Sequence, residues 1–210
     1  MNILFFGDSN TFGTDPAGGP RHSRDVRFTG ILQKELGDNY YIIEEGLGGR
    51  TTVFDDPTEE GRCGFDYIVP CLRSHKPIDL LVIMLGTNDV KERFGANAAL
   101  ITVGMERLIK KVFCVDGVFR DKQNILLICP CAVKEGVVNV TPNRGLGSEE
   151  RSRELIPLYR DLAKKLNIPY MVADDYAEAS DIDKVHLDAK SHHALATAIK
   201  EKILEIEETT

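Results

Sequence analysis

Residues 3–13 of the 210-residue chain read Ile3-Leu4-Phe5-Phe6-Gly7-Asp8-Ser9-Asn10-Thr11-Phe12-Gly13. The apolar run predicts a buried strand, and the small polar residues after it predict a tight turn. Glycine at both ends of the turn permits backbone geometry that a side chain would obstruct. The residues after Ser9 can open a helix whose free N–H groups face the same point. The stretch therefore predicts a serine presented at the end of a strand, either as a nucleophile or within an anion-binding turn.

Four further stretches have the pattern of strands, and helical stretches separate them. The expected strands are residues 40–43, 80–85, 125–128 and 169–173, and the expected helices are 25–36, 65–75, 96–115, 148–166 and a last one from near Asp188. Parallel neighbours in a sheet require crossover connections of this kind, which place helices on both faces. The sequence thus predicts an α/β fold, a three-layer α/β/α sandwich with a five-stranded parallel sheet. We expect one domain over residues 1–210.

The helical stretches also carry local expectations. Asp188 is a good N-cap, and the apolar stripe of the last helix is Leu195, Ile199, Ile203 and Ile206. In residues 96–115, helical spacing predicts a single apolar stripe that consists of Leu100, Val103, Leu108, Val112 and Val115. Pro70 falls inside residues 65–75, so we expect that helix to be irregular.

Composition narrows the classes of function. The chain is 42% hydrophobic and 28% charged, with no apolar run of the ~18 to 20 residues that a membrane span needs. A formal net charge of −7 without a basic cluster argues against nucleic acid and favours small neutral substrates. The odd number of cysteines, five, suits reduced thiols. Because no basic segment or cleavage site precedes the first strand, we expect a cytoplasmic location.

The loops with unusual content all follow expected strands. Ser9 follows the first strand, Gly49 the second, Asn88 the third, and Asp183 with His186 the fifth. Ligands of open parallel sheets bind beyond the carboxyl ends of the strands, so these residues should converge. His186 can take the proton of Ser9 while Asp183 fixes its tautomer. The N–H groups of Ser9 and Gly49 and the amide of Asn88 can form an oxyanion hole, and this set needs no cofactor or metal.

The same residues resemble a known family, the SGNH or GDSL hydrolases. Its four blocks occur in order, as Gly7-Asp8-Ser9, the Gly49 loop, Gly86-Thr87-Asn88-Asp89 and Asp183-Lys184-Val185-His186. Residues 44–47, 50–52, 56–58 and 83–89 look like the arylesterase/acyltransferase branch of that family. The resemblance implies a serine esterase with a flavodoxin-like core, whose catalytic Asp and His share one loop. Two departures are Asn10, where the family name expects Leu, and the absence of Trp from the acyl pocket.

Substrate size depends on the loops around the serine. Residues 131–147 are long enough for a flap over the strand ends, and residues 15–24, with few large apolar residues, would form the other wall. We therefore expect esters with short acyl groups, of the acetyl, aryl or carbohydrate type. A thioesterase, lysophospholipase or carbohydrate deacetylase with the same triad remains an alternative, as does a non-catalytic flavodoxin-like anion-binding module. Whether copies of the chain form a homo-oligomer, and whether acyl transfer accompanies hydrolysis, stay open.

The other titratable residues near these motifs have simpler interpretations. His22, His75, His192 and His193 are expected on the surface or within helices. Asp8 and Asp89 could form a carboxylate pair for acid/base chemistry. Since small turn residues flank both, hydrogen bonds to the turn backbone are the favoured interpretation.

Overall fold

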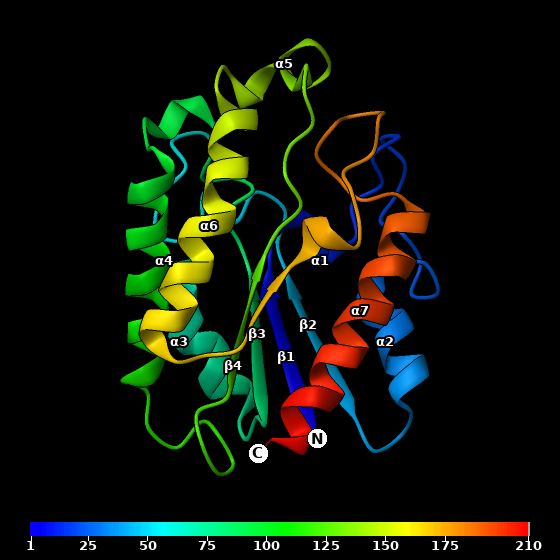
Figure 1. The fold of residues 1–210 in the computed structure, drawn as a ribbon, viewed down its shortest axis with the longest axis vertical. Helices are drawn as coiled ribbons and strands as arrows, with labels where there is room; N and C mark the ends of the chain where they lie inside the picture. Colours follow the sequence, from blue (N-terminus) through cyan, green and yellow to red (C-terminus); the bar gives the residue numbers. More distant parts are fainter. Residues whose placement is uncertain (210) are drawn as a thin grey trace.

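The computed structural model describes residues 1–209 as a parallel sheet with helices on both faces (Figure 1). The five strands are β1 (Asn2–Gly7), β2 (Tyr41–Gly46), β3 (Leu80–Met84), β4 (Ile125–Cys129) and β5 (Tyr170–Val172). Their order is β2-β1-β3-β4-β5, and every neighbouring pair is parallel. The predicted α/β fold is confirmed, and this order is that of flavodoxin-like sheets.

The longer helices form the two outer layers (Figure 1). On one face lie α2 (Phe28–Leu36) and α7 (Ala189–Glu208), and on the other α3 (Gly64–His75), α4 (Ala98–Phe113) and α6 (Ser148–Leu166). The shorter elements are α1 (Ser9–Phe12), α5 (Val137–Val140), and the 3-10 turns η1 (Glu92–Phe94), η2 (Pro142–Arg144) and η3 (Ala173–Asp175). Asp188 caps α7 as expected, because its carboxylate accepts a hydrogen bond of 2.8 Å from the Ser191 N–H.

Alternating side chains of the strands face two separate cores. Leu4 and Phe6 of β1 pack with α3, α4 and α6, whereas Ile3 and Phe5 pack with α2 and α7. All five residues of β3 are buried, as expected for a strand that is covered on both faces. Burial on both faces fixes the register of β1 and therefore the position at which its chain leaves the sheet.

The sheet has its topological switch point at β1. From β1 the chain crosses to β2 on one side, and it returns to place β3 on the other side of β1. The loops after β1 and β3 therefore diverge at their shared edge and open a crevice, which is where such sheets bind ligands. Ser9 follows β1 and Asn88 follows β3, so the fold itself brings these two residues to the crevice.

The expected stripe of α4 was right for Leu108, Val112 and Val115 and wrong for two other residues, and the expected irregularity of α3 was wrong. Leu100 and Val103 are exposed by 50% and 59%, while Ile101, Met105, Leu108 and Val112 are buried. Since apolar residues occur on both sides of this helical stripe, periodicity could not decide which edge faces the sheet. The helix α3 runs without a break through Pro70, whose ring lies on the exposed side, where water can satisfy the carbonyl that loses its partner.

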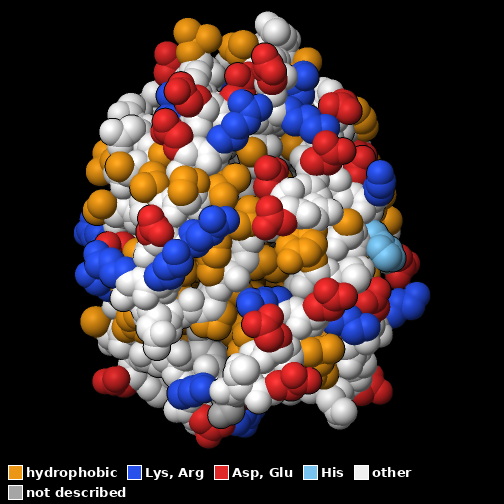
Figure 2. All heavy atoms as spheres, in the orientation of Figure 1, with side chains coloured by type: hydrophobic (Ala, Val, Ile, Leu, Met, Phe, Trp, Pro, Cys, Tyr) orange, Lys and Arg blue, Asp and Glu red, His pale blue; other side chains and the backbone are white. Residues whose placement is uncertain are grey.

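The face of the molecule in Figure 2 mixes acidic and basic side chains, with apolar patches between them. No helix within residues 1–209 is both long and apolar enough to cross a membrane. The five cysteines are free thiols in the structure, in agreement with the prediction of reduced cysteines, and Cys114 alone among them is exposed. The start of β1 and the end of α7 lie together at the amino-terminal edge of the sheet (Figure 1).

Candidate active site

Ser9 stands at the point where β1 becomes helix α1. Asp8 caps α1, with its carboxylate accepting a 2.9 Å hydrogen bond from the Asn10 N–H, and Gly13 ends the helix at φ 87°. The helix has only four residues. Its dipole is therefore that of a single turn, weaker than the sequence suggested. Gly46 at the end of β2 lies against the backbone of Thr11 and Phe12, where a Cβ would overlap with it, and this close approach presses α1 against the sheet.

The structure brings Ser9, His186 and Asp183 together. The Ser9 Oγ lies 2.9 Å from Nε2 of His186, although the two residues are 177 positions apart in the chain. The other ring nitrogen, Nδ1, lies 2.5 Å from Oδ2 of Asp183. The second carboxylate oxygen of Asp183 accepts from the backbone N–H groups of Val185 and His186, at 3.0 and 2.9 Å. Burial opposes ionisation of Asp183, but these hydrogen bonds outweigh it and lower the pKa of the carboxyl.

The turn that joins Asp183 to His186 has an unusual backbone. Lys184 adopts φ 65°, in the left-handed region that a lysine seldom occupies. Neighbouring segments hold it there: the Thr141 hydroxyl donates to the Asp183 carbonyl at 2.9 Å, and the Lys134 N–H donates to the Lys184 carbonyl at 3.0 Å. The segment 131–147 thus supports the turn that carries His186, which is consistent with strained backbone at functional sites.

Asn10 connects the serine turn to the histidine loop. Its Oδ1 accepts a 3.0 Å hydrogen bond from the Leu187 N–H, and its Nδ2 donates to the Val185 carbonyl at 3.4 Å. These two partners flank His186, and Asn10 is itself buried. The departure from the family pattern at this position therefore has a structural explanation, because a leucine could form neither bond. Sequence reasoning missed this role, since nothing near Asn10 in the chain indicates partners so far away.

Gly49 and Asn88 lie beside Ser9 and line the same cleft. The Asn88 Nδ2 donates to the Arg50 carbonyl at 3.1 Å, which leaves its second N–H with only a long contact of 3.5 Å to Asp8. Gly49 has φ 78°, so glycine is required there. The Arg50 guanidinium anchors this loop, since it lies 4.2 Å from the centroid of the Phe6 ring and donates to the carbonyls of Gly7 and Glu45.

The two buried aspartates of the motifs are bound to turns, as the sequence favoured. Asp89 accepts from the Thr52 N–H at 2.8 Å and from its hydroxyl at 2.5 Å, which ties the Gly49 loop to the Asn88 turn. Burial raises the pKa of the Asp89 carboxyl to about 6 despite these bonds, and burial also raises the pKa of Asp8. His186 already places a base 2.9 Å from the Ser9 hydroxyl, so neither Asp8 nor Asp89 is needed as an acid or a base.

The cleft has a volume of about 380 Å³. Its lining consists of Ser9, Thr14, Gly48, Gly49, Asp56, Thr58, Glu59, Arg62, Asn88, Lys91, Arg93, Thr141, Asn143, Arg144, Val185 and His186. The segment 131–147 reaches the cleft, as predicted for a flap. The prediction that residues 15–24 form the opposite wall was wrong, because residues 56–62 occupy that position. A larger hollow of 440 Å³ lies at the other end of the sheet, but its lining of Met1, Asp79, Arg120, Asp121, Lys122, Asn124, Ile206 and Glu207 offers no nucleophile and base.

His192, the histidine nearest to His186 in the chain, lies elsewhere. It is fully buried in α7, stacked on Phe28, and its Nδ1 accepts from the Phe28 N–H at 3.3 Å. Burial lowers the pKa of His192 to about 3, with the charge of His22 acting in the same direction. The imidazole is therefore a neutral core group, in agreement with its expected place within a helix.

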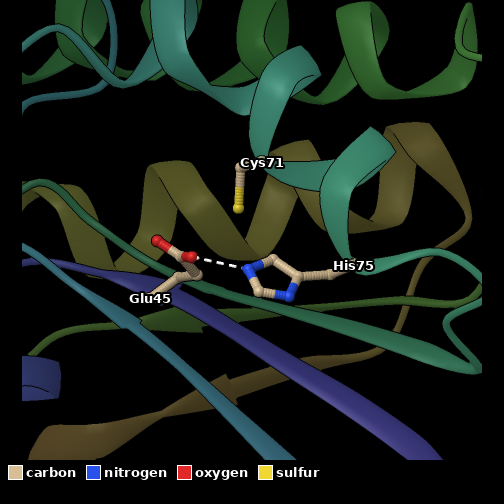
Figure 3. Close-up of side chains that lie close together, drawn as sticks. All are labelled: Glu45, Cys71 and His75. Atoms are coloured by element: carbon tan, nitrogen blue, oxygen red, sulfur yellow. Dashed lines mark hydrogen bonds and ion pairs between the residues drawn. The ribbon is translucent and has the colours of Figure 1, made fainter.

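A second cluster of titratable side chains lies beside the sheet (Figure 3). Glu45, at the end of β2, faces Cys71 and His75 of α3, with donor atoms within 4.8 Å of one another, and the His75 Nε2 lies 2.7 Å from the Glu45 carboxylate. This geometry could hold a metal ion. However, the charge of the Arg50 guanidinium acts on both the thiol and the carboxylate and opposes a cation there. Burial raises the pKa of Cys71 to about 12, so we interpret the cluster as a hydrogen-bonded contact between His75 and Glu45 that joins α3 to β2.

The sequence profile of the GDSL-like lipase/acylhydrolase family matches residues 5–194. The chain belongs to this family. It is a carboxylic ester hydrolase of the GDSL or SGNH type, and the predicted resemblance is confirmed.

Solved structures support the assignment of this hydrolase. The native aryl esterase of M. smegmatis is 33% identical, with a TM-score of 0.90 over 97% of this chain and 98% of that chain. A carbohydrate acetylesterase family member from Sinorhizobium meliloti is 35% identical, with a TM-score of 0.91 over 96% of each chain. The lipase/acylhydrolase from Enterococcus faecalis, 19% identical with a TM-score of 0.70 over 96% and 94%, shares the fold. None of the curated proteins compared with the chain matches it.

The connection through Asn10 predicts a positioning effect. Asn10→Leu, which restores the residue of the GDSL pattern, should lower kcat by about tenfold, because it leaves the buried Leu187 N–H without an acceptor and loosens the loop that carries His186. Steady-state hydrolysis of p-nitrophenyl acetate measures the effect. Asp188→Ala is the matched control: it removes the cap of α7 and about 1 kcal/mol of stability, yet should keep kcat within about twofold. Equal losses of kcat in both variants would contradict a positioning role.

The buried Asp89 predicts a pH dependence of stability. Its folded pKa of about 6 lies above the unfolded value of 3.8, so the folded protein binds the proton more tightly and stability falls as pH rises from 4 to 6. Asp89→Asn removes this titration. The free energy of unfolding of the variant, relative to the natural chain, should therefore rise by on the order of 3 kcal/mol across that window. Urea unfolding at several pH values measures the difference.

Asp56→Asn is the control for that measurement. Burial opposes ionisation of Asp56, but hydrogen bonds from Thr58 and the charge of Arg93 lower the pKa of its carboxyl. Its stabilisation is therefore present above the unfolded pKa and is lost as pH falls, the opposite sign to Asp89. A difference between the natural chain and Asp89→Asn that stays constant with pH would show that folding does not raise the pKa of Asp89.

Proposed function

We propose that the chain is a serine esterase that hydrolyses short-chain carboxylic esters through Ser9, His186 and Asp183. The observation that carries the proposal is the continuous line of contacts from Ser9 Oγ to Nε2 of His186 at 2.9 Å and from Nδ1 to Asp183 at 2.5 Å. A nucleophile, a base and an orienting carboxylate at such distances are the arrangement that acyl transfer needs.

In the proposed mechanism, Ser9 Oγ attacks the ester carbonyl while His186 Nε2 takes its proton. The ionised Asp183 holds the imidazole in the tautomer with a proton on Nδ1 and stabilises the imidazolium that forms. His186 then gives the proton to the leaving alcohol, which departs and leaves an acyl group on Ser9. Water, deprotonated by His186, attacks the acyl-enzyme and releases the acid, and the proton returns to Ser9.

Three groups are proposed to stabilise the negative oxygen of the tetrahedral intermediates. They are the backbone N–H groups of Ser9 and Gly49 and the Nδ2 of Asn88. Support comes from their common position on the cleft and from the Asn88 N–H that has only a long contact. The Arg50 carbonyl fixes the amide by accepting its other N–H, so the donor needs little rearrangement when charge develops on the substrate.

The lining of the cleft favours small acyl groups. Val185 is the one aliphatic side chain among the lining residues, and the rest are polar, charged or glycine. A long acyl chain would gain little there, since each methylene contributes about 0.8 kcal/mol only where it can be buried. The similar structures include an aryl esterase and a carbohydrate acetylesterase, and these names support the proposal of acetyl-type or aryl esters as substrates. The thioesterase and lysophospholipase alternatives share the machinery but would need a more apolar cleft.

The role of Ser9 predicts a large loss on substitution. Ser9→Ala and His186→Ala should each lower kcat by on the order of 10⁴-fold or more, because the three residues act as a unit. Hydrolysis of p-nitrophenyl acetate gives kcat, and a fluorophosphonate probe should label the natural chain at Ser9 and leave Ser9→Ala unlabelled.

Two comparisons make that test specific. His193→Ala, which changes an exposed histidine of α7, should retain activity close to that of the natural chain. An unlabelled, inactive natural chain would instead support the non-catalytic anion-binding module. Full activity of Ser9→Ala would show that another group is the nucleophile.

Acyl-chain length gives a separate prediction. Across p-nitrophenyl esters from acetyl to palmitoyl, kcat/KM should be highest between acetyl and butyryl and should fall for longer chains, because the cleft offers almost no apolar surface. Values that rise through lauroyl and palmitoyl would replace the short-ester proposal with a lipase or long-chain thioesterase.

A further inference from the structure

The cleft beside Ser9 carries an excess of positive charge. Four cationic side chains line it, Arg62, Lys91, Arg93 and Arg144, against the carboxylates of Asp56 and Glu59. Both carboxylates are already paired: Asp56 lies 2.8 Å from Arg93, and Glu59 binds Arg62. Lys91 and Arg144 therefore face the cleft without a carboxylate of their own.

Lys91 is the more informative of the two. It is only 7% exposed, and within residues 1–209 its ammonium group makes no hydrogen bond or ion pair. Its N–H donates to the Asn88 carbonyl at 3.1 Å, so it stands one turn beyond Asn88. Burial lowers the pKa of Lys91 to about 8; the charges of Arg144 and Arg93 act in the same direction, and the more weakly acting carboxylates of Asp56 and Asp8 oppose them. The ammonium thus remains mostly protonated at pH 7 in an unfavourable place.

Arg144, from the segment 131–147, adds a second buried charge. It is 3% exposed, and its guanidinium donates to the Thr87 carbonyl but forms no ion pair within the described chain. The carboxylates that act on it at longer range are Asp8 and Asp183. Asp183 is engaged by His186, and Asp8 accepts from the Asn10 N–H and lies 3.5 Å from the Asn88 Nδ2, so both carboxylates are already hydrogen-bonded to other groups.

Two buried cations that repel each other are costly unless an anion joins them. We propose that Lys91 and Arg144 form a binding subsite for a negatively charged group of the ester substrate, such as a carboxylate. This inference rests on the proposed esterase function and narrows its substrate class. The anion would occupy the wall of the cleft on the Asn88 side, so the ester carbonyl can still meet Ser9. The subsite can serve the acyl or the alcohol part of the substrate.

Matched pairs of esters test the proposal. Mono-p-nitrophenyl glutarate and its methyl ester carry the charge, or its neutral analogue, on the acyl part. In the second pair, 4-acetoxybenzoate carries the negative charge on the alcohol part, and methyl 4-acetoxybenzoate is its neutral analogue. For each pair, the ratio of kcat/KM for the anionic ester to that for the neutral ester is measured, after subtraction of the spontaneous rate, in the natural chain, Lys91→Met and Arg62→Met. Because the same two esters are used with every protein, their difference in intrinsic reactivity cancels when the ratios of the proteins are compared.

In at least one pair, Lys91→Met should lower this ratio by about tenfold, the effect of losing a charge-assisted contact. Arg62→Met, which changes a cation already paired with Glu59, should alter it by less than about threefold. Equal ratios in all three proteins for both pairs would overturn the subsite. A loss in Lys91→Met that is the same for neutral and anionic esters would also overturn it, because Lys91 would then act on the reacting oxygen.

A binding measurement separates this inference from the esterase proposal. Calorimetric titration of monomethyl glutarate should give at least about tenfold weaker binding to Lys91→Met than to the natural chain. If no ester were hydrolysed and this difference persisted, the esterase proposal would fail and the anion subsite would stand. Equal binding to both proteins would overturn the subsite whatever the activity.

Discussion

The pairing of β1 with both β2 and β3 is the constraint on which the rest of the structure depends. Because all three strands are parallel, their carboxyl ends meet at one edge of the sheet. The loops that follow β1 and β3 run to opposite faces of the sheet, so a crevice opens between them at that edge. The buried strands cannot shift by one residue without turning Leu4 and Phe6 into the wrong core, which holds Ser9 at a fixed height above the sheet. The small residues around Ser9 then let the other loops approach it.

The sequence was sufficient where local pattern and a topological rule agree. Buried strands followed by polar turns located Ser9, Asn88 and the loop of His186, and the rule for parallel sheets predicted their convergence. It was insufficient where a contact joins distant positions. Asn10 looked like an unusual turn residue because its partners follow it by more than 170 positions. Lys91 stands in a charged stretch after β3 where nothing in the sequence distinguishes it, and only its burial in the structure marks it. Residues 15–24 come soon after Ser9 in the sequence but do not line the cleft. Closeness in the chain does not determine which loop folds over a site.

Charge at the site differs from charge of the whole molecule. The chain carries a net charge of −7, which favoured neutral substrates at the level of composition. Within the cleft, however, the carboxylates of Asp56 and Glu59 are paired with arginines. The positive charges of Lys91 and Arg144 then dominate the local electrostatic field. Over distances longer than the Debye length the solvent screens the rest of the molecule, so a bound substrate responds mainly to these nearest groups. A net charge describes solubility and long-range encounter more than it describes a pocket.

The separation between Ser9 and His186 also affects when the site can exist. Ser9 is synthesised near the start of the chain. The turn from β1 into α1 can form once β2 and β3 have been made and pair with β1. His186 emerges 177 residues later, and its loop can settle against Asn10 only once that far segment has left the ribosome tunnel. Proteins are made at roughly 5 to 20 residues per second, so the serine waits on the order of ten seconds without its histidine. A chain that ends before His186 also lacks α7, which covers one face of the sheet. Under the proposed mechanism, ester hydrolysis would therefore report that synthesis has passed both.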